Sequence, residues 1–141
     1  PSALQYLVDQ WKRRHPGVRC SFATDGSLEE LGEVTNITLY RFVQECLTNI
    51  ARHAKATLVQ IDVSRNETND LILQVKDNGV GTDKILHFSG SRLGLRGMRE
   101  RVQALEGKID INTQAGQGFA IHVVLPHSAA KSIAPPTRKT V

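Results

Sequence analysis

The side chains best suited to chemistry fall in two segments of the chain. On a helical wheel of about 100° per residue, Glu45, Asn49 and His53 form one row of a helix expected over residues 37–54. The row runs along the edge of an apolar stripe, so an acid, an amide and an imidazole share one border of the helix. The second segment, Asp77-Asn78-Gly79-Val80-Gly81, directly follows an alternating strand, and its glycines permit positive φ and close approach of the backbone to a ligand.

Each of these segments also has a simpler interpretation. A polar row beside an apolar stripe is typical of a half-exposed helix edge, and Asp-Asn-Gly is common in tight turns. A third segment, Leu93-Gly94-Leu95-Arg96-Gly97-Met98, opens a helix. Its N-terminal N–H groups suit phosphate, but it could equally be a plain joint between a loop and a helix.

Periodicity gives the elements that must position these segments. Helical spacing predicts helices over 4–14 and 37–54, the second capped by Asn36, and a third helix over 99–105 that ends at Gly107. Alternation predicts strands over 18–23, 57–64, 71–76, 108–112 and 119–125. The last four strands look like two hairpins. We therefore expect an α/β two-layer sandwich, a mixed β-sheet covered on one face by about three helices.

The long helix should bury one arc of its surface against this sheet. The arc contains the residues Leu39, Val43, Cys46, Leu47, Ile50 and Ala54.

Composition and charge exclude several classes of protein. The chain of 141 residues is 40% hydrophobic and 23% charged, as expected for one globular domain, and no apolar run is long enough to span a membrane. Three of the 18 basic residues and none of the 14 acidic ones follow residue 126, so the net charge of +4 falls to +1 over residues 1–126. A nucleic-acid interface is therefore not expected. Residues 127–141 are expected to form a disordered tail behind a single domain, 1–126.

Common motifs narrow the chemistry further. The sequence contains no GxxxxGK[ST], no GxGxxG after a strand, no GxSxG and no HExxH. Cys20 and Cys46 lie far apart and outside any CxxC pattern. We expect them to be reduced thiols in a cytoplasmic protein.

Four segments in this order resemble the nucleotide-binding boxes of sensor histidine kinases. Residues 42–54 resemble the N box, 77–81 the G1 box, 94–101 the G2 box and 116–118 the last glycine box. Within this family, the Gln-Glu pair at 44–45 and the Gly-Met-Arg-Glu-Arg run resemble the corresponding residues of one subfamily. Its members partner NarL-type response regulators, and the resemblance is close to the hexose-phosphate sensor kinases. The resemblance covers about residues 4–126 and implies the Bergerat ATP-binding fold.

The resemblance implies roles for residues of the long helix. Asn49 would bind Mg²⁺, and Glu45 would lie beside the metal. Arg52 and His53, at the basic end of the box, would meet phosphate.

It also implies how the base and the triphosphate would be held. Asp77 would accept a hydrogen bond from the exocyclic amine of adenine, whereas the guanine oxygen would leave this carboxylate unpaired. Gly79 and Gly81 would let the backbone pass close to the base, and residues 82–93 would form the ATP lid. The residues that would close over the triphosphate are Gly94, Leu95, Arg96 and Gly97.

The activity implied is transfer of the γ-phosphoryl group of Mg-ATP to a histidine, which depends mainly on positioning and charge neutralisation. None of the five histidines lies in the pattern of the acceptor motif, so we expect a catalytic domain whose acceptor is on a separate dimerisation domain. The parent would be a homodimeric kinase with its catalytic part in the cytoplasm, either free or anchored in the bacterial inner membrane. This fragment would be a monomer. The alternatives are an anti-sigma-factor-type serine kinase and a non-catalytic nucleotide-sensing module. One departure is Phe119, which stands where the last box usually continues with Thr.

Overall fold

The computed structural model describes residues 3–25, 32–80, 95–114 and 116–126. Its elements, in chain order, are α1 (Ala3–Arg14), β1 (Arg19–Thr24), α2 (Glu33–Asn49), the π-helical turn η2 (Ile50–Ala54), β2 (Leu58–Arg65), β3 (Leu71–Asp77), α3 (Leu95–Ala104), β4 (Lys108–Thr113) and β5 (Phe119–Leu125).

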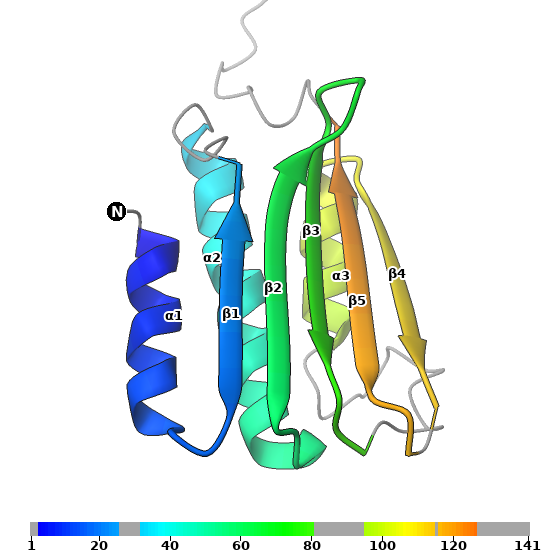
Figure 1. Cartoon of the computed structure of the whole chain (residues 1–141). Coiled ribbons are helices and arrows are strands. Elements are labelled where there is room, and N and C mark those ends of the chain that lie inside the picture. The colour runs from blue at the N-terminus through cyan, green and yellow to red at the C-terminus, as the bar shows by residue number, and fades with distance from the viewer. Residues whose placement is uncertain (1–2, 26–31, 81–94, 115, 127–141) are drawn as a thin grey trace, which may run out of the picture.

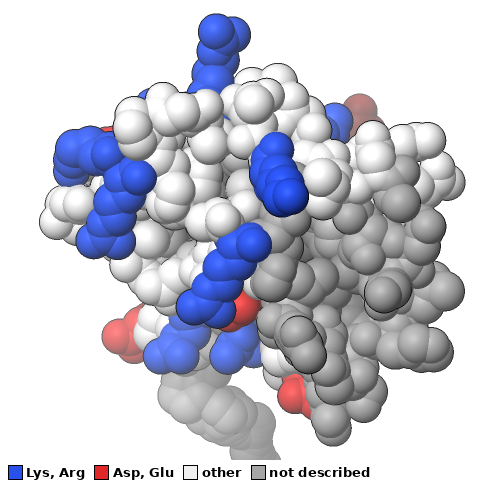
Figure 2. Space-filling view, turned by 90° about the horizontal axis from the view of Figure 1, so that it is seen from below, with Lys and Arg blue, Asp and Glu red and all other residues white. Residues whose placement is uncertain are grey.

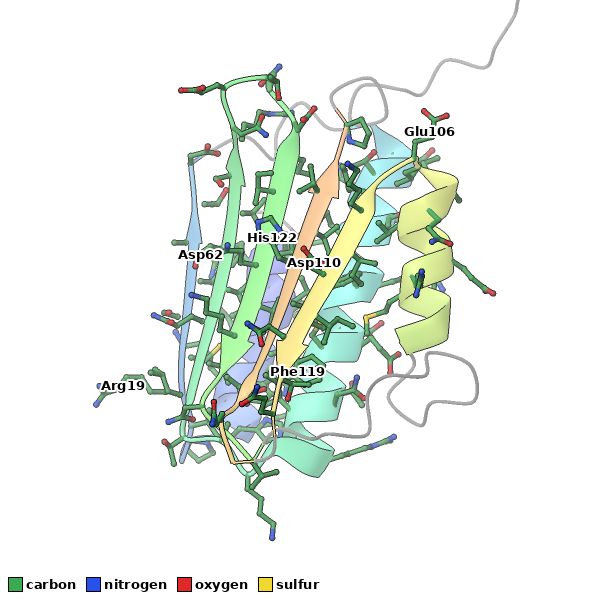
Figure 3. The ribbon with its side chains drawn as sticks, turned by 90° about the vertical axis from the view of Figure 1, so that its right-hand side faces the viewer. Arg19, Asp62, Glu106, Asp110, Phe119 and His122 are labelled. Carbon is green, nitrogen blue, oxygen red and sulfur yellow. The ribbon has the colours of Figure 1, made fainter. Side chains whose placement is uncertain are left out.

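The strands of the described ranges form one five-stranded sheet in the order β1-β2-β3-β5-β4. β1 runs parallel to β2, whereas the β2–β3, β3–β5 and β4–β5 pairs are antiparallel. The helices α1, α2 and α3 lie against one face of the sheet (Figures 1 and 3). The expected two-layer sandwich with a mixed sheet is therefore confirmed.

The core lies between the helices and this face of the sheet. Alternate residues of β3 are buried, as are alternate residues of β2 and β5, because successive side chains of a strand point to opposite faces. The predicted arc of α2 is buried from Leu39 to Ile50, and α1 and α3 add Val8 and Met98. Burying one large apolar side chain contributes roughly 1.5–3 kcal/mol, so this continuous cluster fixes the helices on the sheet.

The start of α2 differs from the expectation. The helix begins at Glu33 with Gly32 as its N-cap, and Asn36 lies inside the first turn, where its N–H donates to the Gly32 carbonyl over 3.0 Å. Thr35 and Thr38 are buried, so the face that packs on the core extends a full turn before the predicted start. Packing of that extra turn outweighs the capping preference of Asn36.

Many elements meet at the end of the sandwich that is drawn at the bottom of Figure 1, called the lower end below. α1 and β3 finish there, β1, β2, β5 and α3 begin there, and α2 reaches it through η2. The segments singled out in the sequence lie at the ends of these elements. The fold thus gathers them at one end.

Both cysteines are free and buried, as expected for reduced thiols. In the described part of the chain, none of the helices has the length and apolarity needed to cross a bilayer.

Candidate functional site

Glu45 and Asn49 lie one turn apart on α2, at the border between its buried and exposed sides. Both side chains are partly buried, whereas Cys46 is buried and Gln44 is exposed. The predicted polar edge beside the apolar stripe is therefore present in the structure. Phe42, which the helical wheel places in the same row, belongs to the core and is 2% exposed.

The polar edge continues into an unusual helix end. The backbone N–H of Ile50 donates to the carbonyls of both Cys46 and Leu47, after which η2 widens into a π-helical turn. The turn is capped by Lys55, which has left-handed backbone angles of φ 52° and ψ 39°. Single π-helical turns are frequent at functional sites. Arg52 is exposed on this turn, and His53 belongs to it, although the imidazole lies outside the described side chains.

Asp77 is the last residue of β3 and continues the row of Leu73 and Val75, so its carboxylate is on the helical face of the sheet. The backbone N–H of Gly79 donates to Oδ1 of this carboxylate over 2.7 Å. Burial raises the pKa of Asp77, and the Gly79 hydrogen bond opposes that rise. The result is a sheltered carboxylate with one oxygen fixed by its own turn.

The Cys46 thiol links Asp77 to the polar edge of α2. Burial raises its pKa, and the negative charges of Glu45 and Asp77 raise it further. Both carboxylates are therefore within electrostatic reach of one thiol in the core. Asp77 at the end of β3 and Glu45 on the polar edge of α2 thus both lie near Cys46.

Asn78 attaches the segment after β3 to the start of β2. Its Oδ1 accepts hydrogen bonds from the backbone N–H groups of Thr57 and Leu58, each of 2.9 Å. Its Nδ2 donates to the Thr57 hydroxyl over 2.9 Å. In the sequence, Asn78 stands out only as part of a tight turn and of the segment that resembles the G1 box. Its supporting role depends on partners 20 and 21 residues away, which local patterns do not reveal.

The last glycine segment lies on the other side of Asp77. Gly116 and Gly118 have φ values of 81° and 80°, which an L side chain rarely adopts. The Gly116 N–H donates to the Val80 carbonyl, and the Thr113 hydroxyl donates to the Gly118 carbonyl over 2.8 Å. The turn before β5 is therefore fastened to the segment that follows Asp77.

The remaining predicted residues belong to the segment before and within α3. The N-terminus of α3, formed by Leu95, Arg96 and Gly97, lies at the lower end and offers N–H groups without partners within the helix (Figure 1). The side chains of Leu95 and Arg96 lie outside the described ones. Gly81, Gly94 and the predicted lid, 82–93, lie outside the described residues.

The lower end is also rich in positive charge. Figure 2 shows Lys and Arg side chains spread over the described part of this end, with few Asp or Glu among them. Basic residues in or next to the elements that finish or begin there include Lys12, Arg13, Arg14, Arg19, Arg52, Lys55 and Lys76. Such a surface favours an anionic ligand.

Comparisons with known proteins agree with this arrangement. The family profile described as "Histidine kinase-, DNA gyrase B-, and HSP90-like ATPase" matches residues 35–129. The signal transduction histidine-protein kinase/phosphatase DegS of Brevibacillus brevis is 38% identical over 112 residues, which cover 79% of this chain and 28% of DegS. The oxygen sensor histidine kinase NreB of Staphylococcus carnosus is 31% identical over 125 residues, which cover 89% of this chain and 35% of NreB.

Solved structures share the fold. A blue-light activated histidine kinase from Erythrobacter litoralis EL346 superposes with a TM-score of 0.78 at 23% identity, covering 91% of this chain and 42% of that one. The ATP-binding domain of PrrB from Mycobacterium tuberculosis gives a TM-score of 0.70 at 21% identity, covering 87% and 90%. Because the family profile extends from the first turn of α2 through β5, the chain belongs to the family of histidine kinase-, DNA gyrase B- and HSP90-like ATPases.

Proposed function

We propose that this chain is the ATP-binding catalytic domain of a sensor histidine kinase, which donates the γ-phosphoryl group of ATP to a histidine on a separate dimerisation domain. The observation that carries the proposal is the sheltered Asp77 carboxylate, oriented by Gly79 beside the polar edge of α2. Relatives that are named histidine kinases support this class of activity. The parent kinase would act in the cytoplasm, where ATP is available, and would signal to a NarL-type response regulator.

Asp77 would select the base. An ionised carboxylate accepts hydrogen bonds only, so it suits the exocyclic amine of adenine and is mismatched with the carbonyl oxygen of guanine. A hydrogen bond to a charged group contributes about 1.5–3 kcal/mol, and its loss leaves a partly buried charge unpaired. Gly79, which is buried beside the carboxylate, and Gly81 would leave room for the base next to the backbone.

Asn49 and Glu45 would serve the phosphate side of the site. Their amide and carboxylate oxygens are hard donors that fit Mg²⁺, which prefers octahedral oxygen coordination and keeps several waters. Among the described residues, no group of three His, Cys, Asp or Glu side chains could hold a metal ion, so phosphate oxygens of the nucleotide would complete the coordination. Bound Mg²⁺ would neutralise charge on the phosphates during transfer.

Positive groups at the lower end would balance the remaining charge of the triphosphate. Arg52 is exposed on η2, and His53 follows it on the same turn. The first turn of α3, residues 95–97, would direct N–H groups at a phosphate, together with Gly94 before it. These groups would bind and orient ATP, while the acceptor histidine comes from another domain.

Titration calorimetry with ATP, GTP and a non-hydrolysable ATP analogue, each with and without Mg²⁺, tests the proposal. We expect ATP and its analogue to bind with micromolar to millimolar affinity in the presence of Mg²⁺, and GTP to bind far more weakly. Equal affinities for ATP and GTP would contradict the role of Asp77. Mixing the chain with a separately prepared dimerisation domain and labelled ATP should place phosphate on histidine, and phosphoserine would favour the serine-kinase alternative. ATP binding without transfer to any acceptor would favour a nucleotide-sensing module.

A further inference from the structure

We infer that the Phe119 side chain forms an apolar wall beside Asp77 and limits the size of the purine edge that reaches this carboxylate. The inference rests on the proposed binding of adenine at Asp77 and names a residue that determines specificity at that site.

The register of the sheet places the ring next to the carboxylate. Phe119 is the direct partner of Asp77 in the β3–β5 ladder and of Thr113 in the β4–β5 ladder. Directly opposed residues of an antiparallel pair point to the same face, with Cβ atoms about 4.5–5.5 Å apart. Ile121, two residues along β5, is buried in the core, so Phe119 also points to the helical face.

Phe119 lies at the rim of the core. Its side chain is only partly buried and packs against the buried cluster, and Figure 3 shows it where β5 begins, at the lower end. One side of the ring therefore belongs to the core, and the exposed remainder borders the region that Asp77 faces. An aromatic ring in this position also keeps water away from the carboxylate, in agreement with the raised pKa of Asp77.

The backbone that carries the ring is fixed on two sides. Gly118 is in direct contact with the Asp77 carbonyl and has a φ of 80°. Its own carbonyl accepts the 2.8 Å hydrogen bond from the Thr113 hydroxyl. With residue 118 held against both β3 and β4, the start of β5 has little freedom to move the ring away from Asp77.

A purine whose exocyclic amine donates to Asp77 would consequently place the edge next to that amine against the Phe119 ring. Adenine carries only hydrogens on that amine and fits beside a wall. A bulky substituent on the same nitrogen would leave one N–H for Asp77 but would collide with the ring. Replacing Phe119 with a smaller side chain should open space for the substituent. It should also remove an apolar contact to adenine itself.

The test compares ATP with N6-benzyl-ATP by calorimetry in the wild type, Phe119→Ala and Phe119→Leu. We expect the wild type to prefer ATP, and Phe119→Ala to shift the affinity ratio towards N6-benzyl-ATP by at least about ten-fold, a typical effect of changing the shape of an apolar pocket. Phe119→Leu should shift it in the same direction by about three-fold. Ile121→Val, on the same strand and face but two pairs further from Asp77 along the β3–β5 ladder, should leave the ratio unchanged.

A gain of binding to the bulky nucleotide cannot result from general destabilisation of the fold, and the leucine variant keeps an apolar side chain if the alanine variant folds poorly. An unchanged ratio in the folded variants would overturn the inference. Asp77→Asn, measured in parallel, separates the two proposals. If Asp77→Asn weakens ATP binding while the Phe119 variants keep the wild-type affinity ratio, the recognition of adenine by Asp77 is supported and the inference about Phe119 is wrong. If it leaves ATP binding unchanged, both are wrong.

Discussion

The α-carbon of Gly118 lies so close to the carbonyl oxygen of Asp77 that a methyl group on it would overlap that oxygen. The φ of Gly118 is 80°, in the region that favours glycine. This contact joins the turn before β5 to the end of β3. It therefore links the strand that carries Asp77 to the strand that carries Phe119.

Gly118→Ala should destabilise the domain by about 2–4 kcal/mol, because it adds an overlap with Asp77 to the cost of a left-handed backbone. Gly116→Ala is the matched control, since Gly116 has a φ of 81° but nothing within 4 Å of an added Cβ. It should cost only about 1 kcal/mol. Urea unfolding of both variants measures the difference, and equal losses would show that the contact contributes nothing beyond backbone strain.

Asp77→Asn should separate stability from nucleotide binding. Burial raises the pKa of Asp77, so the folded protein binds this proton more tightly than the unfolded chain does. The stabilising contribution is complete below the ordinary pKa of 3.8 and is lost as the pH rises through the folded value. At neutral pH the partly buried charge of Asp77 thus destabilises the fold. Asparagine removes this charge and can still accept the hydrogen bond from the Gly79 N–H.

We therefore expect Asp77→Asn to be at least as stable as the wild type at pH 7 in urea unfolding, with this difference shrinking towards pH 4. ATP affinity should fall about 10- to 100-fold, as expected for loss of a charged acceptor. Asp62→Asn, an exposed change on the other face of the sheet (Figure 3), should leave ATP affinity unchanged. A clear loss of stability in Asp77→Asn would mean that the carboxylate serves the fold instead of a ligand.

Asn78→Ala should loosen the segment that orients Asp77. The change removes two hydrogen bonds from backbone N–H groups and one to the Thr57 hydroxyl, which should cost about 1–3 kcal/mol. Asn78→Asp keeps both acceptor interactions and loses only the donor, so its effect should be clearly smaller. Hydrogen exchange at the N–H groups of Thr57 and Leu58 reports this directly, and unchanged protection in Asn78→Ala would refute the supporting role.

Asn49→Ala should remove the dependence of ATP binding on Mg²⁺ while the domain stays folded. The amide oxygen would be lost as a metal ligand, whereas alanine is well tolerated within a helix. Gln44→Ala, on the exposed side of the same helix, is the control and should bind Mg-ATP as the wild type does. If Mg²⁺ strengthens ATP binding equally in Asn49→Ala and the wild type, the metal is held elsewhere.

The arrangement of helices and strands follows from periodicity because buried faces impose it. The alternation in 71–76 and 119–125 predicted two strands whose register aligns Asp77 with Phe119, and the helical wheel predicted the polar edge of α2. Side chains that pack on a core leave a regular signature in the sequence. Pairing between distant strands and the meeting of segments at the lower end required the structure, because they depend on long-range contacts.

Local exceptions were harder to predict, as the end of α3 shows. Gly107 was expected to end this helix through its backbone freedom, but the left-handed residue is Glu106, with a φ of 61°. Gly107 is required for space instead, since a Cβ there would lie 2.6 Å from the Val124 carbonyl oxygen. The π-helical turn η2 likewise has no sequence signature. Both features depend on how the helix end meets the rest of the molecule.

Lys55→Gly should stabilise the fold and weaken ATP binding. Lys55 caps η2 with a φ of 52°, and glycine adopts this conformation without a Cβ clash, which should add about 0.5–1 kcal/mol of stability. Glu106→Gly is the matched control, because Glu106 has the same kind of backbone at the opposite end of the molecule (Figure 3).

Both variants should unfold at higher urea concentration than the wild type. Only Lys55→Gly should weaken ATP binding, by about two- to five-fold at low ionic strength and less at high salt, because it removes a positive charge near the phosphates. Calorimetry at two salt concentrations measures this effect. If both glycine variants bind ATP equally well, the positive charge of Lys55 takes no part in holding the triphosphate, and the phosphates lie away from the end of η2.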